Sequence, residues 1–368
     1  MNKETTVDKD LVVETNFDTA NIDFYEPTSE PFTLYGINPP DEKRDRYYRL
    51  PKEVVDKGTF VRGLDWHGAN TAGARVKFRT NSKTISIIAV LDKIGGLSHM
   101  PNTGVCGFDL YVDDKYFANF IPPFWIRTEG NAYSSQKDLT EYIFAGEEIV
   151  EREITIYFPL YCDVVSLKIG IEKGATLNKT HGYKNKTSIV FYGHSITQGG
   201  CVSHPGNSYS NIIERDLSVD CVNFGFSGSA NGEDAMCDYV ADRDTLALIY
   251  DYDHNSLPDL LKERHQRFFE RYRKIHPTVP IIIIPTTDCE PNLEMRKARF
   301  DICYNTYKSA IKNGDKNVYF LDAFKEINER CGDYAYVERN GGHLNDVGSI
   351  AMAKMIEEIL VKIINFKK

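Results

Sequence analysis

Four residues in the second half of the chain could together carry out acyl transfer. Ser195 stands in "FYGHSITQGG", directly after an apolar run, and Gly228 stands in "NFGFSGSA". Asn255 follows in "YDYDHNS", and His343 lies near the C-terminus in "NGGHLNDVG". In this order the residues supply a nucleophile, a backbone N–H, a side-chain amide donor and a base. Acyl transfer needs these parts, because the serine attacks a carbonyl while the donors stabilise the developing oxyanion.

Each of these residues also has a simpler interpretation. A Gly-x-Ser sequence after a strand is usually a turn, and Asn255 could cap a helix that begins near Leu257. His343 could be a loop histidine without a role in catalysis. Other catalytic templates are absent from the sequence: there is no GxSxG, no HExxH, no Walker A motif and no GxGxxG after a strand. The joint occurrence of the four residues at the ends of apolar runs therefore favours a hydrolytic site.

The elements that must position these residues follow from the apolar pattern after about residue 185. Five runs predict buried strands: "SIVFYG", "CVNFGF", "LALIYDY", "PIIIIP" and "NVYFLDA". Helical patterns at 208–217, 257–275 and 346–362 alternate with or follow them. Apolar residues recur at helical spacing in the segment 257–275, at Leu257, Leu261, Phe268, Tyr272 and Ile275. Buried strands alternating with helices predict a parallel sheet covered on both faces, with ligands at the carboxyl ends of its strands.

The first half of the chain has a different sequence pattern, with short β-prone runs and no long stretch of helical periodicity. Between residues 50 and 172 these runs are "ARVKFRT", "TISIIAVL", "GFDLYVDDKYFANF", "EITIYFPLY" and "VVSLKIGI". The third contains a predicted turn at Asp113-Asp114. This spacing predicts an antiparallel β-sandwich of jelly-roll type. We therefore predict an N-terminal extension (1–49), a β-sandwich domain (50–180) and an α/β domain (185–368).

The net charge and the apolar content of the chain argue against several classes of binding partner. The 368 residues carry a formal net charge of −9, which argues against nucleic acid or an anionic membrane as the main partner. No apolar run approaches the ~20 residues that a membrane helix needs. The polar start "MNKETTVDKDLVVETN" predicts a cytoplasmic protein, although a secreted chain that had lost its leader would look the same. The eight cysteines include no CxxC pair, so they predict buried thiols rather than a zinc motif.

The order of the motifs resembles the SGNH, or GDSL-type, hydrolase superfamily. "YGHSITQGGCVSHPGNSYSNII" resembles its first block, "VNFGFSGSA" its second, "DYDHN" its third and "GGHLNDVGSIAMA" its fifth. In the first half, "GFDLY" (107–111) resembles the GxDLY motif of a domain that precedes one subgroup of these hydrolases. The resemblance covers about residues 50–362. It implies a flavodoxin-like three-layer α/β/α domain with a parallel sheet, preceded by an antiparallel β-sandwich.

The resemblance also implies roles for individual residues. Ser195 corresponds to the nucleophile and His343 to the base, and the oxyanion hole would consist of Ser195, Gly228 and Asn255. The implied activity is hydrolysis of an ester in a small molecule or an oligosaccharide, plausibly an acetyl ester of a carbohydrate. No metal or organic cofactor is expected, since acyl transfer by this route needs neither. The sequence does not predict an oligomeric state.

The chain departs from the family pattern at two positions. His194 stands where the family commonly has aspartate before the serine, and Asn340 stands three residues before His343, where the family has its acid. Loss of that carboxylate can lower turnover by ~10⁴. Three arrangements remain open: a Ser–His dyad, a backbone carbonyl in place of the acid, or a nearby carboxylate such as Glu338.

Two further residues are candidates for substrate contact, and two other functions stay open. His194 could touch the substrate, with a structural role behind the nucleophile as the alternative. Trp66, in "LDWHGAN", could reach the site from the sandwich, with packing as the alternative. The departures also fit a carbohydrate-binding protein with a weakened hydrolase domain. An acyltransferase is the third possibility, because an acyl-enzyme does not dictate its acceptor.

Overall fold

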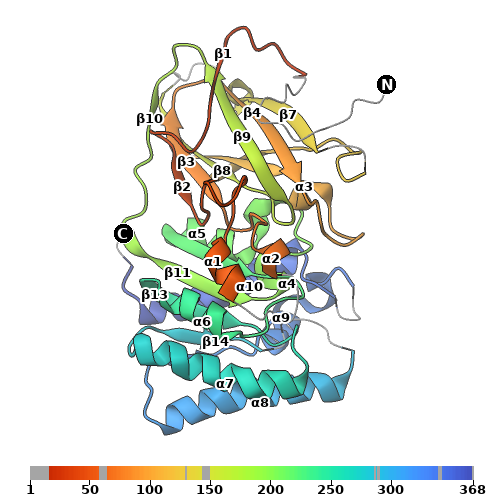
Figure 1. Ribbon diagram of the computed structural model, residues 1–368, viewed down its shortest axis with the longest axis vertical. Helices are drawn as coiled ribbons and strands as arrows, with labels where there is room; N and C mark the ends of the chain where they lie inside the picture. Colours follow the sequence, from red (N-terminus) through yellow and green to blue (C-terminus); the bar gives the residue numbers. More distant parts are fainter. Residues whose placement is uncertain are drawn as a thin grey trace.

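The computed structural model describes residues 16–57, 64–128, 131–142, 150–285, 287, 291–338 and 342–366. An N-terminal β-sandwich lies above a C-terminal α/β unit in the view of Figure 1. Among the described residues, no helix combines the length and the apolar content that crossing a bilayer requires.

The sandwich consists of two antiparallel sheets packed face to face. The first sheet has the order β1 (Ile22–Tyr25), β9 (Asp163–Glu172), β4 (Thr84–Asp92), β7 (Ala132–Asp138). The second has the order β10 (Leu177–Lys179), β3 (Arg75–Thr80), β8 (Arg152–Tyr157), β5 (Phe108–Val112), β6 (Lys115–Phe120), and β2 (Thr33–Tyr35) also pairs with β3. Alternate residues such as Ile85 and Ile87 on β4 and Val76 and Phe78 on β3 meet in one core. The predicted turn at Asp113-Asp114 is confirmed, with φ of 49° and 61° at its two residues.

The N-terminal boundary of the sandwich differs from the prediction. The segment 1–49 was expected to be an extension, yet β1 adds to the edge of β9 and β2 adds to β3. These strands have only four and three residues, which is too short for a readable alternation. The segment that begins at residue 50 was predicted to belong to the sandwich. Instead, Leu50 and Leu64 pack into the core of the α/β unit. The short helices of this segment are α1 (Lys52–Lys57) and α2 (Leu64–His67).

The α/β unit is built on the predicted parallel sheet. Its strand order is β12 (Val219–Gly225), β11 (Asn185–Gly193), β13 (Thr245–Asp251), β14 (Ile281–Ile283), β15 (Val318–Phe320), and all neighbours are parallel. Numbered in chain order, the five strands lie in the flavodoxin-like order 2-1-3-4-5. The second strand is added on one side of β11 and the later strands on the other side, so the strand order reverses there. The carboxyl ends of β11, β12 and β13 therefore lie side by side at the switch point, where ligands bind in such sheets.

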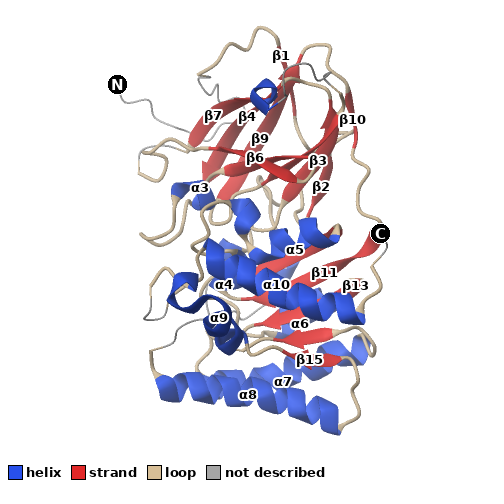
Figure 2. Ribbon diagram, turned by 180° about the vertical axis from the view of Figure 1, so that it is seen from behind, coloured by secondary structure: helices blue, strands red, loops and turns tan. Residues whose placement is uncertain are grey.

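Helices cover both faces of this sheet, which confirms the three-layer prediction. One face carries α6 (Asp234–Ala241), α7 (Pro258–Ile275) and α8 (Leu293–Lys312), and the other carries α5 (Tyr209–Leu217), α9 (Ala323–Cys331) and α10 (Asp346–Ile363). Figure 2 shows α10 lying across its face of the sheet next to α5. The side chains of β11 pack on both faces of the sheet. Val190 and Tyr192 lie in one core, and Ile189 and Phe191 lie in the other.

Short elements complete the described structure. They are α3 (Asn102–Val105), α4 (Ser195–Gln198) and the 3₁₀ turns at Leu139–Tyr142, Pro205–Asn207 and Gly332–Ala335. On α7 the predicted stripe is buried at Leu261, Phe268 and Tyr272, whereas Leu257 and Ile275 are exposed at its two ends. The buried stripe is therefore shorter than the periodicity predicts, since Leu257 precedes the helix as its N-cap and Ile275 is its last residue.

A buried arginine joins the two halves of the molecule. Arg49 is 1% exposed, and its guanidinium donates to four backbone carbonyl oxygens. Two of these acceptors, His67 and Asn70, precede the sandwich strand β3, at 2.9 and 2.6 Å. The other two, Asn223 and Gly225, belong to β12 of the α/β unit, at 3.1 and 2.8 Å. A planar group with five donors suits such a junction, because it can bind several carbonyl groups at once.

A buried ion pair strengthens the same interface. Arg75 on β3 is fully buried, and its Nε lies 3.6 Å from the carboxylate of Glu214 on α5. Burial alone would raise the pKa of Glu214, but the positive charge of Arg75 and hydrogen bonds from neighbouring hydroxyl groups outweigh it, so the pKa is lowered. Removing one partner of a buried pair typically costs about 3–5 kcal/mol. The sandwich and the α/β unit are therefore held in one arrangement.

The aspartate of the GxDLY motif has a specific task at this interface. Asp109 on β5 is fully buried, and one of its oxygens accepts the backbone N–H of Gly206 at 2.6 Å and contacts the ring of His204. Its other oxygen accepts from the Asn119 side chain at 2.8 Å. The motif thus ties the sandwich to the loop that follows the candidate nucleophile along the chain.

Candidate active site

Ser195 lies just beyond the carboxyl end of β11, the first strand of the α/β sheet in chain order. Strand β11 ends at Gly193, His194 caps α4, and Ser195 is the first residue of that single helical turn. Gly193 is required because a Cβ there would lie 2.0 Å from Thr197 Oγ1 and 2.3 Å from the Asp251 carbonyl oxygen. Gly199 then ends the turn with φ of 100°, a left-handed conformation that favours glycine. The sequence thus forms a sharp strand-to-helix turn that presents the serine at the sheet edge.

The structure brings Ser195 and His343 together. The His343 Nε2 atom lies 2.7 Å from Ser195 Oγ, although 148 residues separate them in the sequence. The loop that carries the histidine is held by a backbone hydrogen bond from Val337 N–H to the His343 carbonyl oxygen at 3.0 Å. Asn345 then caps α10 by accepting from two backbone N–H groups of its first turn. The distance is suitable for proton transfer between the two side chains.

The candidate oxyanion donors lie on the two neighbouring strand ends. Gly228 follows β12 in a turn with φ of 67°, where a side chain would be strained. Asn255 follows β13, and its Oδ1 accepts the backbone N–H of Ala230 at 3.2 Å. This bond ties the two loops together, and the role of the Asn255 amide as an oxyanion donor stays a prediction. Asn255 is not the cap of α7, because that position is held by Leu257.

Gln198 holds this arrangement together, and the sequence analysis did not single it out. Its side chain is fully buried at the end of α4. Its Oε1 accepts the backbone N–H of Ser227 at 2.8 Å, which fixes the residue next to Gly228. Its Nε2 donates to the Leu160 carbonyl oxygen at 2.9 Å and to Asn70 Oδ1 at 3.2 Å. One amide therefore connects the serine turn, the glycine loop and the sandwich.

His194 lies behind the serine rather than beside the substrate space. Its ring is only 1% exposed, and its Nδ1 accepts the backbone N–H of Ile196 at 3.3 Å. Its Nε2 lies 3.4 Å from Thr287 Oγ1 and 3.5 Å from the buried carboxylate of Asp251. Sequence reasoning predicted a substrate contact for His194, with a structural role as the alternative. A ring this enclosed cannot meet a ligand, so we assign it to positioning the serine turn.

Trp66 remains a candidate for substrate contact. It lies on α2 with 44% of its surface exposed, and it stacks on His67 with ring centroids 5.1 Å apart. The indole is thus accessible on α2, and its contact with substrate stays a prediction.

The partner of His343 in the family pattern falls outside the described part of the chain. Asn340 is not among the described residues, so its place in the triad stays a prediction. Glu338, the alternative carboxylate, is described and lies near Cys201. Burial, together with the charge of Glu338, raises the pKa of Cys201 to about 12. A thiol with so high a pKa is protonated at neutral pH, which agrees with its assignment as a buried thiol rather than a nucleophile.

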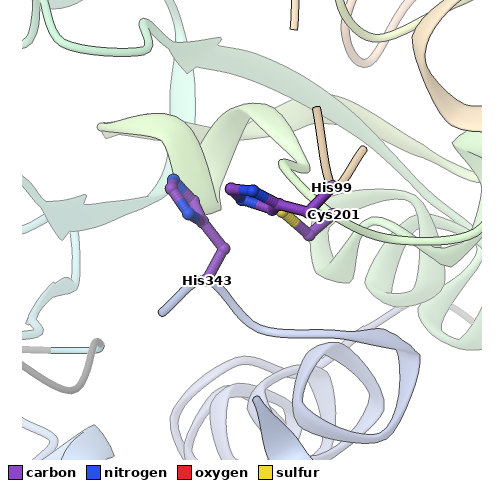
Figure 3. A group of neighbouring side chains, drawn as sticks. All are labelled: His99, Cys201 and His343. Carbon is purple, nitrogen blue, oxygen red and sulfur yellow. The ribbon is translucent and has the colours of Figure 1, made fainter. Parts of the chain in front are cut away.

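The sandwich contributes a histidine that sequence reasoning missed. His99 lies in the loop between β4 and α3, and its ring centroid is 5.9 Å from that of His343. Figure 3 shows these two rings side by side, with the sulfur of Cys201 next to the His99 ring. Nothing in the local sequence around His99 indicates that this loop reaches the α/β unit. A side chain of the sandwich therefore lies beside the candidate base.

Comparisons with known proteins match both halves of the chain. The GxDLY model, described as the N-terminus of SGNH-hydrolase-type esterases, matches residues 22–177, which include β1 and β2. The model of the GDSL-like lipase/acylhydrolase family matches residues 186–361. No functionally curated protein matches the chain.

Solved structures of similar fold cover nearly the whole chain. A GDSL-like lipase from Bacteroides ovatus is 25% identical with a TM-score of 0.79, over 95% of this chain and 100% of that one. The salicylyl-acyltransferase SsfX3 from a tetracycline biosynthetic pathway is 18% identical with a TM-score of 0.74, over 94% and 99%. A family two carbohydrate esterase from Clostridium thermocellum, in complex with cellohexaose, is 14% identical with a TM-score of 0.58, over 90% and 98%.

The sandwich with its GxDLY motif, the 2-1-3-4-5 sheet and the two family matches agree with one another. Residues 186–361 therefore form a GDSL-like lipase/acylhydrolase domain, residues 22–177 form the GxDLY domain that precedes SGNH-hydrolase-type esterases, and the chain is an ester hydrolase.

Proposed function

We propose that the chain cleaves acetyl esters of carbohydrates through a covalent intermediate on Ser195, with His343 as the general base. The observation that carries this proposal is the 2.7 Å contact between Ser195 Oγ and His343 Nε2 at the switch point of the sheet. A serine hydroxyl is a weak nucleophile by itself and becomes reactive when a positioned base takes its proton. The proposal needs only the Ser–His pair, whichever group orients the second nitrogen of the imidazole.

The reaction would run in two halves. In the first, His343 Nε2 takes the Ser195 hydroxyl proton while Oγ attacks the ester carbonyl, and the tetrahedral intermediate collapses. During this collapse the C–O bond to the sugar breaks and the protonated imidazole gives its proton to the departing sugar oxygen, so the sugar leaves as an alcohol and an acyl-serine remains. In the second half, His343 takes a proton from water, the resulting hydroxide attacks the acyl-serine, and the proton returns to Ser195 as the acid leaves.

Three donors would stabilise the oxyanion of both tetrahedral intermediates. They are the backbone N–H groups of Ser195 and Gly228 and the side-chain amide of Asn255. They come from three adjacent strand ends, and the bond between Asn255 Oδ1 and Ala230 N–H fixes the amide before substrate binds. Fixed donors are effective because they do not have to reorganise as charge develops.

Replacing Asn255 with alanine is expected to lower kcat by about 10²–10³-fold, because one oxyanion donor is removed. KM should change little, since the donor acts on charge that develops only in the transition state. Steady-state hydrolysis of p-nitrophenyl acetate measures both constants. Asn178→Ala is the matched control, because Asn178 is exposed on β10 of the sandwich. That variant should keep its kcat. An Asn255→Ala enzyme with wild-type kcat would exclude Asn255 from the oxyanion hole.

Two observations support a small acyl group on a sugar. Ser195 is only 7% exposed, and we take this enclosure of the nucleophile as support for a small acyl group such as acetyl. Trp66 offers an exposed aromatic surface of the kind that packs against apolar faces of ligands. The fold is shared with a carbohydrate esterase solved with cellohexaose, which is compatible with such a substrate.

We expect acetylated xylo- or cello-oligosaccharides to be cleaved with a higher kcat/KM than p-nitrophenyl acetate, and p-nitrophenyl butyrate to be cleaved more slowly than either. Trp66→Ala should lower kcat/KM for the oligosaccharide esters by about three- to tenfold, through lost aromatic contact, and leave the aryl acetate unaffected. Released acetate and nitrophenol report the rates. A preference for butyrate, or equal loss on both substrate classes in Trp66→Ala, would contradict the substrate assignment.

Acyl transfer is the second candidate function. It is supported by the fold that the chain shares with a salicylyl-acyltransferase. The same acyl-serine would then react with an alcohol instead of water. Product analysis in the presence of free oligosaccharide separates the two outcomes, because transfer yields a new ester whereas hydrolysis yields only acid. The third possibility, a carbohydrate-binding protein without catalysis, is disfavoured by the Ser195–His343 contact and by the GDSL-like lipase/acylhydrolase domain of the chain.

A further inference from the structure

We propose that His99, Cys201 and His343 form a binding site for a thiophilic divalent metal ion such as Zn²⁺, and that the bound ion switches the esterase off. One ligand atom from each residue lies within 4.8 Å of the other two. Two imidazoles and one thiolate form a donor set that zinc and cobalt prefer. The binding part of this proposal is independent of the catalytic role of Ser195, whereas the inhibition rests on the proposed function.

The separations fit a metal after small side-chain movements. With Zn–S near 2.3 Å and Zn–N near 2.0–2.1 Å, a tetrahedral site needs its ligand atoms about 3.3–3.6 Å apart. All three ligand atoms lie within 4.8 Å of one another, so no separation would have to shrink by more than about 1.5 Å. Three protein ligands leave the fourth position to a water molecule, as in zinc sites that are open to solvent.

The fold holds the three ligands in place from separate segments. The His99 loop is fixed on both sides of the histidine, because Arg127 donates to the carbonyl oxygens of Gly96 and Met100 at 3.2 and 3.3 Å. Cys201 follows the serine turn, in which the Gly200 N–H donates to the Ser195 carbonyl oxygen at 2.8 Å. A site whose ligands are already gathered needs little reorganisation to bind an ion.

One ring nitrogen of His99 is available to bind a metal ion. Its Nε2 atom is enclosed by protein and has no hydrogen-bond partner in the part of the chain that the structure describes. A buried polar atom left without a partner is costly, so such atoms in native proteins call for an explanation. A metal ion supplied from solution would provide the missing partner.

A bound ion would remove the base whichever nitrogen of His343 it takes. If the ion takes Nε2, it occupies the lone pair that accepts the Ser195 proton. If it takes the other nitrogen, the neutral ring carries its proton on Nε2 and can donate to Ser195 but not accept from it. The Cys201 thiol releases its proton to solvent when the ion binds, as thiolate ligation requires. The metal is therefore an inhibitor of this site and not a cofactor.

The test uses the full chain with Co²⁺ and Zn²⁺, with His99→Gln and Cys201→Ser as the site variants. Cys331→Ser and His181→Gln are the matched controls, because Cys331 lies on α9 and His181 is exposed on the sandwich. The wild type should bind one Co²⁺ with a thiolate-to-cobalt absorption band. Cys201→Ser should lose the band, and both site variants should bind Zn²⁺ at least tenfold more weakly by calorimetry.

Inhibition gives the second readout. Zn²⁺ should abolish wild-type hydrolysis of p-nitrophenyl acetate, and EDTA should restore it. Without metal, His99→Gln and Cys201→Ser should retain wild-type kcat/KM and resist Zn²⁺, whereas the controls should stay sensitive. The proposal is overturned if the wild type shows no thiolate band, or if Cys201→Ser binds Zn²⁺ as tightly as the wild type. A thiolate band in a protein without Ser195-dependent hydrolysis would uphold the metal site and reject the proposed function, so the two failures are distinguishable.

Discussion

A Ser195→Ala variant is expected to lose about 10⁶-fold in kcat for ester hydrolysis, the size of loss seen when a serine hydrolase loses its nucleophile. Without Oγ no acyl-enzyme forms, and the oxyanion donors alone can only assist direct attack by water, which leaves roughly 10³–10⁴ over the uncatalysed rate. Burst kinetics with p-nitrophenyl acetate measure the loss. A fluorophosphonate probe should label the wild type at Ser195 and leave the variant unlabelled.

Ser166→Ala is the matched control for this experiment, because Ser166 is exposed on β9 of the sandwich. It should keep both the wild-type rate and the labelling. Hydrolysis by Ser195→Ala at the wild-type rate would mean that another group attacks the ester. The contact with His343 would then have no catalytic meaning, and the proposed function would have to be abandoned.

His343→Ala is expected to lower kcat to nearly the same extent as Ser195→Ala. The 2.7 Å contact makes the two side chains one unit, since the hydroxyl is reactive only while the imidazole accepts its proton. Residues that act as a unit are strongly non-additive, so the double variant should be no slower than either single one. Independent roles would instead multiply the two losses. Rates of all three variants on one aryl ester decide between these outcomes.

His181→Ala is the matched control for the histidine. His181 lies on the sandwich surface, where its ring contacts Glu153 at 3.0 Å, and its loss should leave kcat unchanged. A small effect of His343→Ala, below tenfold, would contradict its role as the base. That result would direct attention to the other ionisable groups around Ser195.

The local sequence predicted the α/β unit well because the relevant signals are short-range. Each strand of a sheet covered on both faces is a continuous apolar run, and "SIVFYG" and "PIIIIP" are of this kind. Parallel strands place their carboxyl ends at one edge, so Ser195 and Asn255 had to lie near each other once the sheet was predicted. The structure adds the 2.7 Å contact with His343, whose loop position no periodicity specifies.

The parts that sequence reasoning missed depend on long-range contacts. Strands β1 and β2 exist because the edges of β9 and β3 pair with them, and three or four residues give no periodic signal by themselves. Gln198 is an ordinary polar residue until the fold surrounds it with Ser227, Leu160 and Asn70. His99 reaches His343 only because the two domains dock in one orientation.

The guanidinium of Arg49 limits how this chain can be recombined with others. A hydrolase unit covered by a foreign sandwich would bury the carbonyl oxygens of Asn223 and Gly225 without the donor that Arg49 supplies. A foreign sandwich would have to bring a cation to the same spot. We therefore expect chimaeras that take their N-terminal segment from another protein to fold far better when the crossover lies before residue 49 than when it lies between residues 50 and 185.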